Sequence, residues 1–195
     1  MAHVLIGKKA PSFTATAAKE QHILEQFSLE NYRGSYTVLF FYPLNFTFVC
    51  PTELHAFEEA KEEFKLRNAE VVGCSVDSVY SHLAWLSMSK EKGGIQGVSY
   101  PLISDLNKEI ATQFQVLSHE GIAYRGLFIL DQEGIIRHQL INDLPIGRSV
   151  DEVIRVLDAL IFTQKEGSVC PANWKKGHKM MVPSQEGVES YFKAD

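Results

Sequence analysis

The chain has few cysteines, no surplus of basic residues and no long apolar run in its 195 residues. Its three cysteines, at positions 50, 74 and 170, include no C-x-x-C pair and are too few and too widely spaced for a secreted disulfide scaffold. The formal net charge of −5 leaves no electrostatic footprint for nucleic acid. No apolar stretch approaches the roughly 20 residues that span a bilayer. We therefore expect neither a nucleic-acid partner nor a membrane partner.

Two further signals are missing. The segment Met1–Gly7 lacks a basic region followed by a long apolar stretch, so we expect no secretory signal and a cytoplasmic location. Cys50 and His55 are five residues apart on a predicted helix, which puts them on different faces, and no second pair of metal ligands accompanies them. The sequence therefore predicts no metal site and no cofactor.

Strands and helices alternate along the predicted chain. Residues 36–42 form an unbroken β-branched and aromatic run, typical of a strand buried on both faces. An amphipathic helix begins near Cys50 and continues to Phe64, and Ser149 opens a capping box before the last helix. Further strands are predicted near residues 71–76, 100–103, 126–130 and 135–141, with helices after the first two and after the last.

The predicted order is β-α-β-α-β-α-β-β-α, preceded by about 35 residues with weak strand character. Such an order resembles the thioredoxin fold: an α/β fold with a central mixed sheet flanked by helices, an N-terminal extension and a C-terminal tail. We assign residues 1–165 to this domain and residues 166–195 to an extended tail.

Cys50 is the cysteine whose position suggests chemistry. It lies in the first turn of a helix, just beyond the C-terminal edge of a buried strand, where open α/β sheets bind their ligands. The free amide groups and the positive end of the helix dipole favour a thiolate there. Free cysteines are also often inert core residues. Position alone leaves both readings open.

Three ordered motifs decide between these readings. Residues 43–53 read P-L-N-F-T-F-V-C-P-T-E, residues 124–129 read Y-R-G-L-F-I, and residues 166–174 read E-G-S-V-C-P-A-N-W. They resemble the P-x-x-x-T-x-x-C site, the R-G-x-F-I strand and the resolving-cysteine segment of the typical two-cysteine peroxiredoxins. The similarity runs from Gly7 to Lys193, although Asn45 stands where many members have Asp.

The resemblance implies a thiol peroxidase that reduces hydrogen peroxide and organic hydroperoxides through a Cys50 sulfenic acid. Thr47 would orient the peroxide and hydrogen-bond the thiolate, Arg125 would stabilise the thiolate and the departing oxygen, and Pro43 would shield the pocket. Since an ordinary cysteine is a few per cent ionised at pH 7, complete ionisation gains only roughly 30-fold, or about 2 kcal/mol. Enzymes need about 8 kcal/mol or more, so the donors must supply the rest.

The resemblance also assigns supporting residues. Glu53 and Arg148 would hold Arg125 in place, whereas from the residues alone an ordinary surface ion pair is the simpler reading. Cys74 lies in an apolar strand and is expected in the core. We expect Trp85 to pack near the site and the seven histidines to lie mostly on the surface.

In the resembled family, Cys170 forms a disulfide with Cys50 of a partner subunit, and a thioredoxin-like dithiol then reduces it. The resemblance implies a homodimer that can build to a decamer, although the sequence alone leaves an intrachain disulfide open. A general thiol–disulfide oxidoreductase is disfavoured because Glu53 stands where a C-x-x-C would have its second cysteine. A redox-regulated holdase chaperone or a peroxide sensor using the same thiol is the alternative function.

Overall fold

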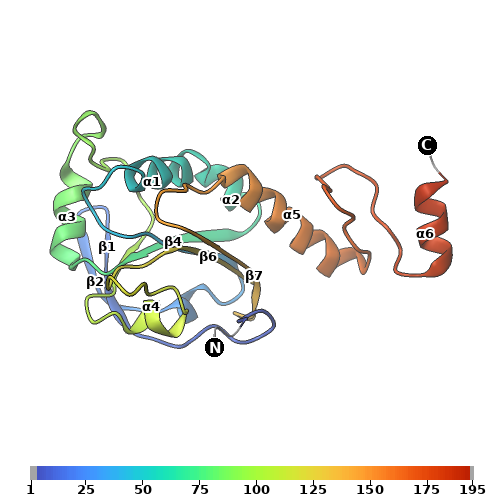
Figure 1. The fold of residues 1–195 in the computed structure, drawn as a ribbon, viewed down its shortest axis with the longest axis horizontal. Coiled ribbons are helices and arrows are strands. Elements are labelled where there is room, and N and C mark those ends of the chain that lie inside the picture. The colour runs from blue at the N-terminus through green and yellow to red at the C-terminus, as the bar shows by residue number, and fades with distance from the viewer. Residues whose placement is uncertain (1–3, 194–195) are drawn as a thin grey trace. The chain divides into compact units, whose positions relative to one another are not determined.

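A seven-stranded mixed sheet organises the first part of the chain in the computed structural model, which describes residues 4–193 (Figure 1). The strand order is β2-β1-β5-β4-β3-β6-β7. Strands β3, β4 and β5 are mutually parallel, and every other pairing in the sheet is antiparallel. The strands are β1 (Ala15–Lys19), β2 (His22–Phe27), β3 (Tyr36–Phe41), β4 (Ala69–Ser75), β5 (Leu102–Ser104), β6 (Arg125–Leu130) and β7 (Ile136–Asn142).

Helices and short 3-10 turns connect and flank these strands. They are η1 (Leu29–Tyr32), α1 (Cys50–Glu59), α2 (Lys61–Lys65), α3 (Val79–Ser87), η2 (Lys90–Lys92), α4 (Glu109–Gln113), α5 (Val150–Glu166) and α6 (Gln185–Phe192). Among the described residues, no helix is both long and apolar enough to span a membrane.

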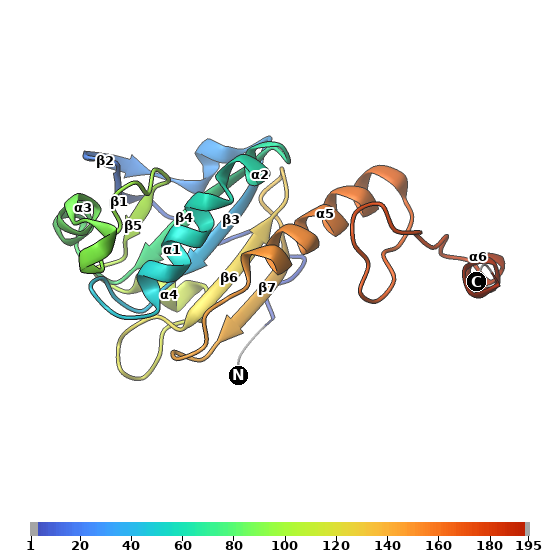
Figure 2. The ribbon, with the colours of Figure 1, turned by 90° about the horizontal axis from the view of Figure 1, so that it is seen from above.

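The two faces of β3 explain how helices cover the sheet. All six residues of β3 are buried, because successive side chains point to opposite faces and both faces are covered. Phe40 stacks on Phe57 of α1 with ring centroids 4.3 Å apart, whereas Phe41 packs against Phe114 beside α4 at 5.3 Å. Figure 2 shows α1 lying over one face of the sheet, in nearly the same direction as β3 and β6. The predicted strand buried on both faces is confirmed.

The chain divides into two compact units, residues 1–148 and 149–195. The first contains the sheet and helices α1 to α4, and the second contains α5 and the segment after it. This division falls before α5, whereas the predicted domain includes that helix, so the boundary at residue 165 stays a prediction. Residues 1–3, in the segment examined for a secretory signal, and residues 194–195 of the predicted tail lie outside the described residues.

The first unit also contains an antiparallel β1–β2 hairpin that was not predicted from the sequence, and β1 pairs with β5. The predicted helix from Cys50 to Phe64 is interrupted at Ala60, where the backbone leaves helical geometry (ψ 6°) between α1 and α2. Backbone hydrogen bonds still continue across it, from Ala60 N to Ala56 O and from Phe64 N to Ala60 O.

In the second unit, Ser149 accepts a hydrogen bond from Glu152 N and so caps α5 as predicted. The tail is not wholly extended, because Ser184 caps the short helix α6 through Gly187 N. This helix corrects the expectation of a tail without regular structure.

Candidate active site

Cys50 is the first residue of α1 and is fully buried. The chain leaves β3 at Phe41 and enters the helix through residues 42–49, and Pro51 occupies the first turn, where its missing N–H costs no helical hydrogen bond. The helix therefore begins at the cysteine, as predicted. Its sulfur lies at the helix N-terminus, where negative charge is favoured.

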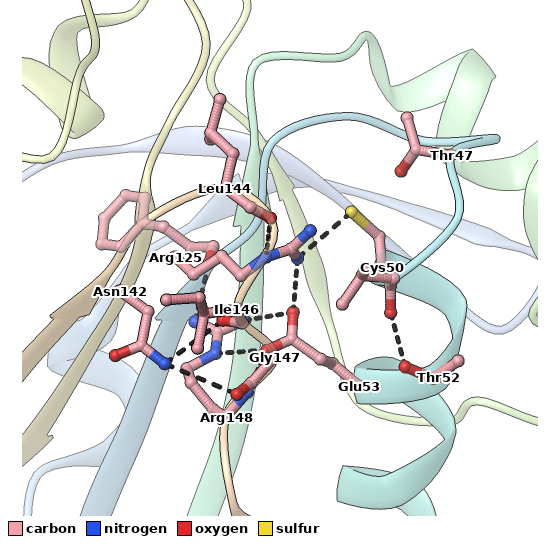
Figure 3. A network of polar contacts seen from close by, with 12 residues as sticks. Thr47, Cys50, Thr52, Glu53, Arg125, Asn142, Leu144, Ile146, Gly147 and Arg148 are labelled. Carbon is pink, nitrogen blue, oxygen red and sulfur yellow. Dashed lines mark hydrogen bonds and ion pairs between the residues drawn. The ribbon is translucent and has the colours of Figure 1, made fainter.

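Arg125 is the cation at this sulfur (Figure 3). It is the first residue of β6, it is 3% exposed, and its Nη1 lies 3.5 Å from Cys50 Sγ. The Nε of the same guanidinium donates to the carbonyl of Leu144 at 2.6 Å. The planar group is therefore held at two points, so its charge has a fixed direction toward the sulfur.

Glu53 joins two arginines inside the protein. Its Oε2 accepts from Arg125 Nη1 at 2.7 Å and from Arg148 Nη2 at 2.9 Å. Its Oε1 accepts from the backbone N and from Nε of Arg148, both at 2.8 Å. The three side chains are at most 4% exposed. The reading of Glu53 and Arg148 as a surface ion pair is therefore wrong.

Arg148 ties this network to the end of the sheet. Its Nη1 donates to the carbonyls of Phe41 at 2.8 Å and Gly126 at 2.6 Å, and its guanidinium lies 5.1 Å from the centroid of the Phe40 ring. Burial lowers the pKa of Arg148, and the carboxylate of Glu53 opposes that shift. These contacts fix Glu53 relative to β3 and β6.

The network has an uneven charge. Two guanidinium groups face one carboxylate, which leaves one positive charge over, and Arg125 directs it at the sulfur of Cys50. A thiolate at that position completes the balance. The buried network therefore favours negative charge on the sulfur, in addition to the effect of the helix N-terminus.

Thr47 and Pro43 lie in the loop that leads into α1, and Pro43 is buried. The hydroxyl of Thr47 donates to the carbonyl of Leu44 at 2.9 Å. Within the described residues it makes no hydrogen bond to Cys50, so the predicted bond from Thr47 to the thiolate is not made in this structure. The oxygen of Thr47 keeps lone pairs that can accept a hydrogen bond.

Cys170 belongs to the second unit and is partly buried there. Its Sγ lies 3.7 Å from the carbonyl oxygen of Ala159 in α5. Burial raises the pKa of Cys170, and the nearby Arg155 opposes that shift. The structure thus gathers Cys50, Glu53, Arg125 and Arg148 into one network and leaves Cys170 in a separate unit.

Two other expectations have mixed outcomes. Cys74 is fully buried in β4, as expected, and burial raises the pKa of its thiol well above the ordinary range. The other described histidines are exposed or half-buried, in line with the expectation, whereas His82 is fully buried in α3. Spacing could have revealed it, because Val79, His82 and Leu86 follow the i, i+3, i+7 pattern of one helix face.

A buried cysteine at a helix start, with a fixed guanidinium at its sulfur, defines a thiol redox centre. The sequence profile of the AhpC/TSA family matches residues 6–139, and that of the C-terminal domain of 1-Cys peroxiredoxin matches residues 159–194. Peroxiredoxin-1 of Gallus gallus is 51% identical over 188 residues, which cover 96% of this chain and 94% of the relative. Thioredoxin peroxidase of Echinococcus granulosus is 50% identical over 189 residues, which cover 96% of this chain and 97% of the relative.

The solved structures agree. The crystal structure of reduced Plasmodium vivax 2-Cys peroxiredoxin superposes with a TM-score of 0.95 at 44% identity, covering 98% of this chain and 100% of that one. The chain therefore belongs to the AhpC/TSA family, as a 2-Cys peroxiredoxin. It is a thiol peroxidase that reduces peroxides, and the predicted thioredoxin-like α/β fold is confirmed.

Proposed function

We propose that Cys50 is the thiol that attacks the hydroperoxide. The observation that carries this proposal is the fixed Arg125 Nη1 at 3.5 Å from a buried sulfur at a helix N-terminus. The thiolate attacks one oxygen of the peroxide and the O–O bond breaks. Cys50 becomes a sulfenic acid, and the other oxygen leaves with the bonding electrons and takes up a proton to form water or an alcohol.

Arg125 and Thr47 have different roles around the sulfur. Arg125 stabilises the charge that passes from the sulfur to the departing oxygen, and its bonds to Leu144 and Glu53 keep it from reorienting during the step. Because the hydrogen of the Thr47 hydroxyl goes to Leu44, Thr47 acts on the substrate as an acceptor. It receives the O–H of the bound peroxide and so aligns the O–O bond with the sulfur.

We further propose that Cys170 of the partner subunit resolves the sulfenic acid. Its thiolate attacks the sulfur of Cys50, a disulfide forms, and the hydroxyl oxygen leaves as water after taking up a proton. Cys50 is fully buried, so the first turn of α1 must open before the two sulfurs can meet. An external dithiol then reduces the disulfide by thiol–disulfide exchange and is itself oxidised.

Relatives support the reductant and the assembly. One relative at 50% identity is named a thioredoxin peroxidase, which favours a thioredoxin-like dithiol. A Plasmodium yoelii Prx1a modified at its N-terminus, 46% identical, is described as forming an artifactual octamer, which supports assembly into a multimer. We propose a homodimer that builds to a decamer, and the cytoplasmic location stays a prediction.

Peroxide consumption with a thioredoxin system tests the assignment of the two thiols. Cys50→Ser should abolish turnover. Cys170→Ser should abolish recycling but keep one stoichiometric oxidation of Cys50, seen by mass spectrometry. Unchanged turnover in Cys50→Ser would overturn the proposal.

The pairing of the disulfide needs its own experiment. Peroxide-treated protein on a non-reducing gel should give a band of twice the 22.0 kDa chain mass. Either Cys50→Ser or Cys170→Ser should remove that band. An oxidised wild type that has lost both free thiols and runs as a monomer would instead indicate an intrachain disulfide.

A further inference from the structure

A buried polar cluster links the loop before Cys50 to helix α3. It consists of Tyr42, Asn45 and His82, of which Tyr42 and His82 are fully buried and Asn45 is 5% exposed. The hydroxyl of Tyr42 donates to Asn45 Oδ1 at 2.9 Å. Asn45 Nδ2 lies 2.9 Å from Ser81 Oγ and 3.0 Å from His82 Nδ1. Neither the charge network nor the sulfur uses these groups.

The hydrogen bond between His82 and Ile103 shows which ring nitrogen of His82 carries the hydrogen. His82 Nε2 lies 3.1 Å from the carbonyl oxygen of Ile103, and a carbonyl can only accept, so Nε2 carries the proton. In the neutral ring Nδ1 is then an acceptor, and Asn45 Nδ2 donates to it. This arrangement gives the amide of Asn45 one orientation: oxygen toward Tyr42, nitrogen toward α3.

Asn45 also holds a tight turn in the loop of residues 42–49 that leads into α1. Asn45 N donates to Asp77 Oδ2 at 2.9 Å, and the next residue, Phe46, adopts a left-handed backbone conformation with φ 57°. Thr47 then returns its hydroxyl to the carbonyl of Leu44. Asn45 is therefore fixed to α3 and to the loop before α3, and the turn that follows it carries Thr47.

We propose that Asn45 is a positioning residue for the peroxide step: through His82 and Tyr42 it holds the turn that places the Thr47 hydroxyl over the sulfur of Cys50. The inference rests on the proposed function of Cys50 and Thr47. It explains why three polar side chains are buried together beside this loop, where apolar side chains would pack without needing partners. It gives α3 the task of supporting the loop that carries Thr47.

Two reactions of Cys50 separate positioning from general structure. Alkylation by iodoacetamide requires only an accessible thiolate, whereas peroxide reduction also requires the aligned donors. In Asn45→Ala we expect the second-order rate constant with hydrogen peroxide to fall by about 10²-fold, the usual cost of a misplaced reacting group. The alkylation rate constant should stay unchanged or rise. Asn107→Ala, at an exposed asparagine before α4, should change neither.

A charge variant gives a signature that a structural role does not. In the wild type the amide nitrogen of Asn45 donates to an unprotonated Nδ1, so protonation of His82 breaks this hydrogen bond. In Asn45→Asp the carboxylate can only accept a hydrogen bond, so protonation of Nδ1 forms the bond between the two side chains. Tyr42 and Asp77 are the other titratable groups that face His82. Burial raises the pKa of Tyr42 well above its ordinary range, so it stays neutral.

The two proteins should therefore respond to pH with opposite signs. Burial lowers the pKa of His82 below 6.5, against an opposing effect of Asp77. The ratio of the peroxide to the alkylation rate constant cancels the thiolate fraction, because both are proportional to it. In the wild type this ratio should be flat at neutral pH and fall only as the pH drops through the lowered pKa of His82. In Asn45→Asp the new carboxylate beside Nδ1 favours the protonated ring, so the ratio should fall as the pH rises and His82 loses that proton.

The outcomes are distinct. An unchanged peroxide rate constant in Asn45→Ala, or an equal loss of both rate constants, overturns the positioning role. Equal pH profiles in the wild type and Asn45→Asp also overturn it, and this variant remains available where Asn45→Ala does not fold. A wild-type Cys50 that reacts with peroxide no faster than a free cysteine overturns the proposed function itself.

Discussion

Replacing Glu53 by glutamine tests the buried charge network. Whichever side the amide nitrogen takes, it faces two donors, since each carboxylate oxygen accepts two hydrogen bonds from the arginines. The variant also leaves two buried guanidinium groups without a counter-charge. Removing one partner of a buried ion pair typically costs about 3–5 kcal/mol. That is a large part of the roughly 5–15 kcal/mol by which a domain is stable.

Activity and stability should change differently in this variant. Because Arg125 loses its ion pair with a carboxylate at 2.7 Å, the rate constant for Cys50 with hydrogen peroxide should fall on the order of 10²-fold. The charge left over near the sulfur rises from one to two, so iodoacetamide labelling of Cys50 at pH 6 should not slow down.

Urea denaturation and stopped-flow oxidation measure the two effects. Glu59→Gln is the matched control on the same helix, because Glu59 and its partner Lys90 are 70% and 63% exposed. It should cost less than about 1 kcal/mol. A loss of stability in Glu53→Gln no larger than in Glu59→Gln would refute the reasoning.

Three further predictions concern the rest of the chain. Tyr100→Phe removes the buried hydroxyl that donates to the Leu54 carbonyl at 2.8 Å. The free energy of unfolding should therefore fall by about 1 kcal/mol, and the amides of α1 should exchange faster. The control Tyr80→Phe, at a side chain that is 73% exposed, should change neither. Burial raises the pKa of Cys74 well above its ordinary range, so iodoacetamide should label Cys74 only after denaturation; labelling of the native protein would contradict this. Burial raises the pKa of Cys170, which is therefore a neutral thiol at pH 7. The rate of disulfide formation in a single turnover should therefore rise about tenfold from pH 7 to 8. A rate that does not change with pH would count against attack by the Cys170 thiolate.

The reactive cysteine could be located from sequence because its signals are local. The apolar run before Pro43, the helix start at Cys50 and the motif around it lie within about 20 consecutive residues. Hydrophobic periodicity and turn residues determine such elements directly. The hairpin β1–β2 escaped because Ala15–Lys19 has no β-branched residue other than Thr16, and its place depends on pairing with β5.

The charge network could not be derived from the residues alone. Glu53 and Arg148 are 95 positions apart, and only the fold brings Oε1 to the guanidinium and buries both. The residues alone favour a surface pair, since most ion pairs are exposed, and only the resemblance pointed to a contact with Arg125. Asn45 shows the opposite case: the sequence marks it only as a position where many members have Asp, yet its amide is buried among polar partners.

The rate constant of Cys50 with hydrogen peroxide, measured at pH 7 in Cys170→Ser, tests the central claim most directly. Complete ionisation alone can raise the rate only roughly 30-fold above an ordinary cysteine. In the proposed mechanism Arg125 and Thr47 also stabilise and align the breaking bond, so we predict a rate constant far above that 30-fold limit. A value at or below it would contradict the account, since the sulfur alone would then explain the reaction.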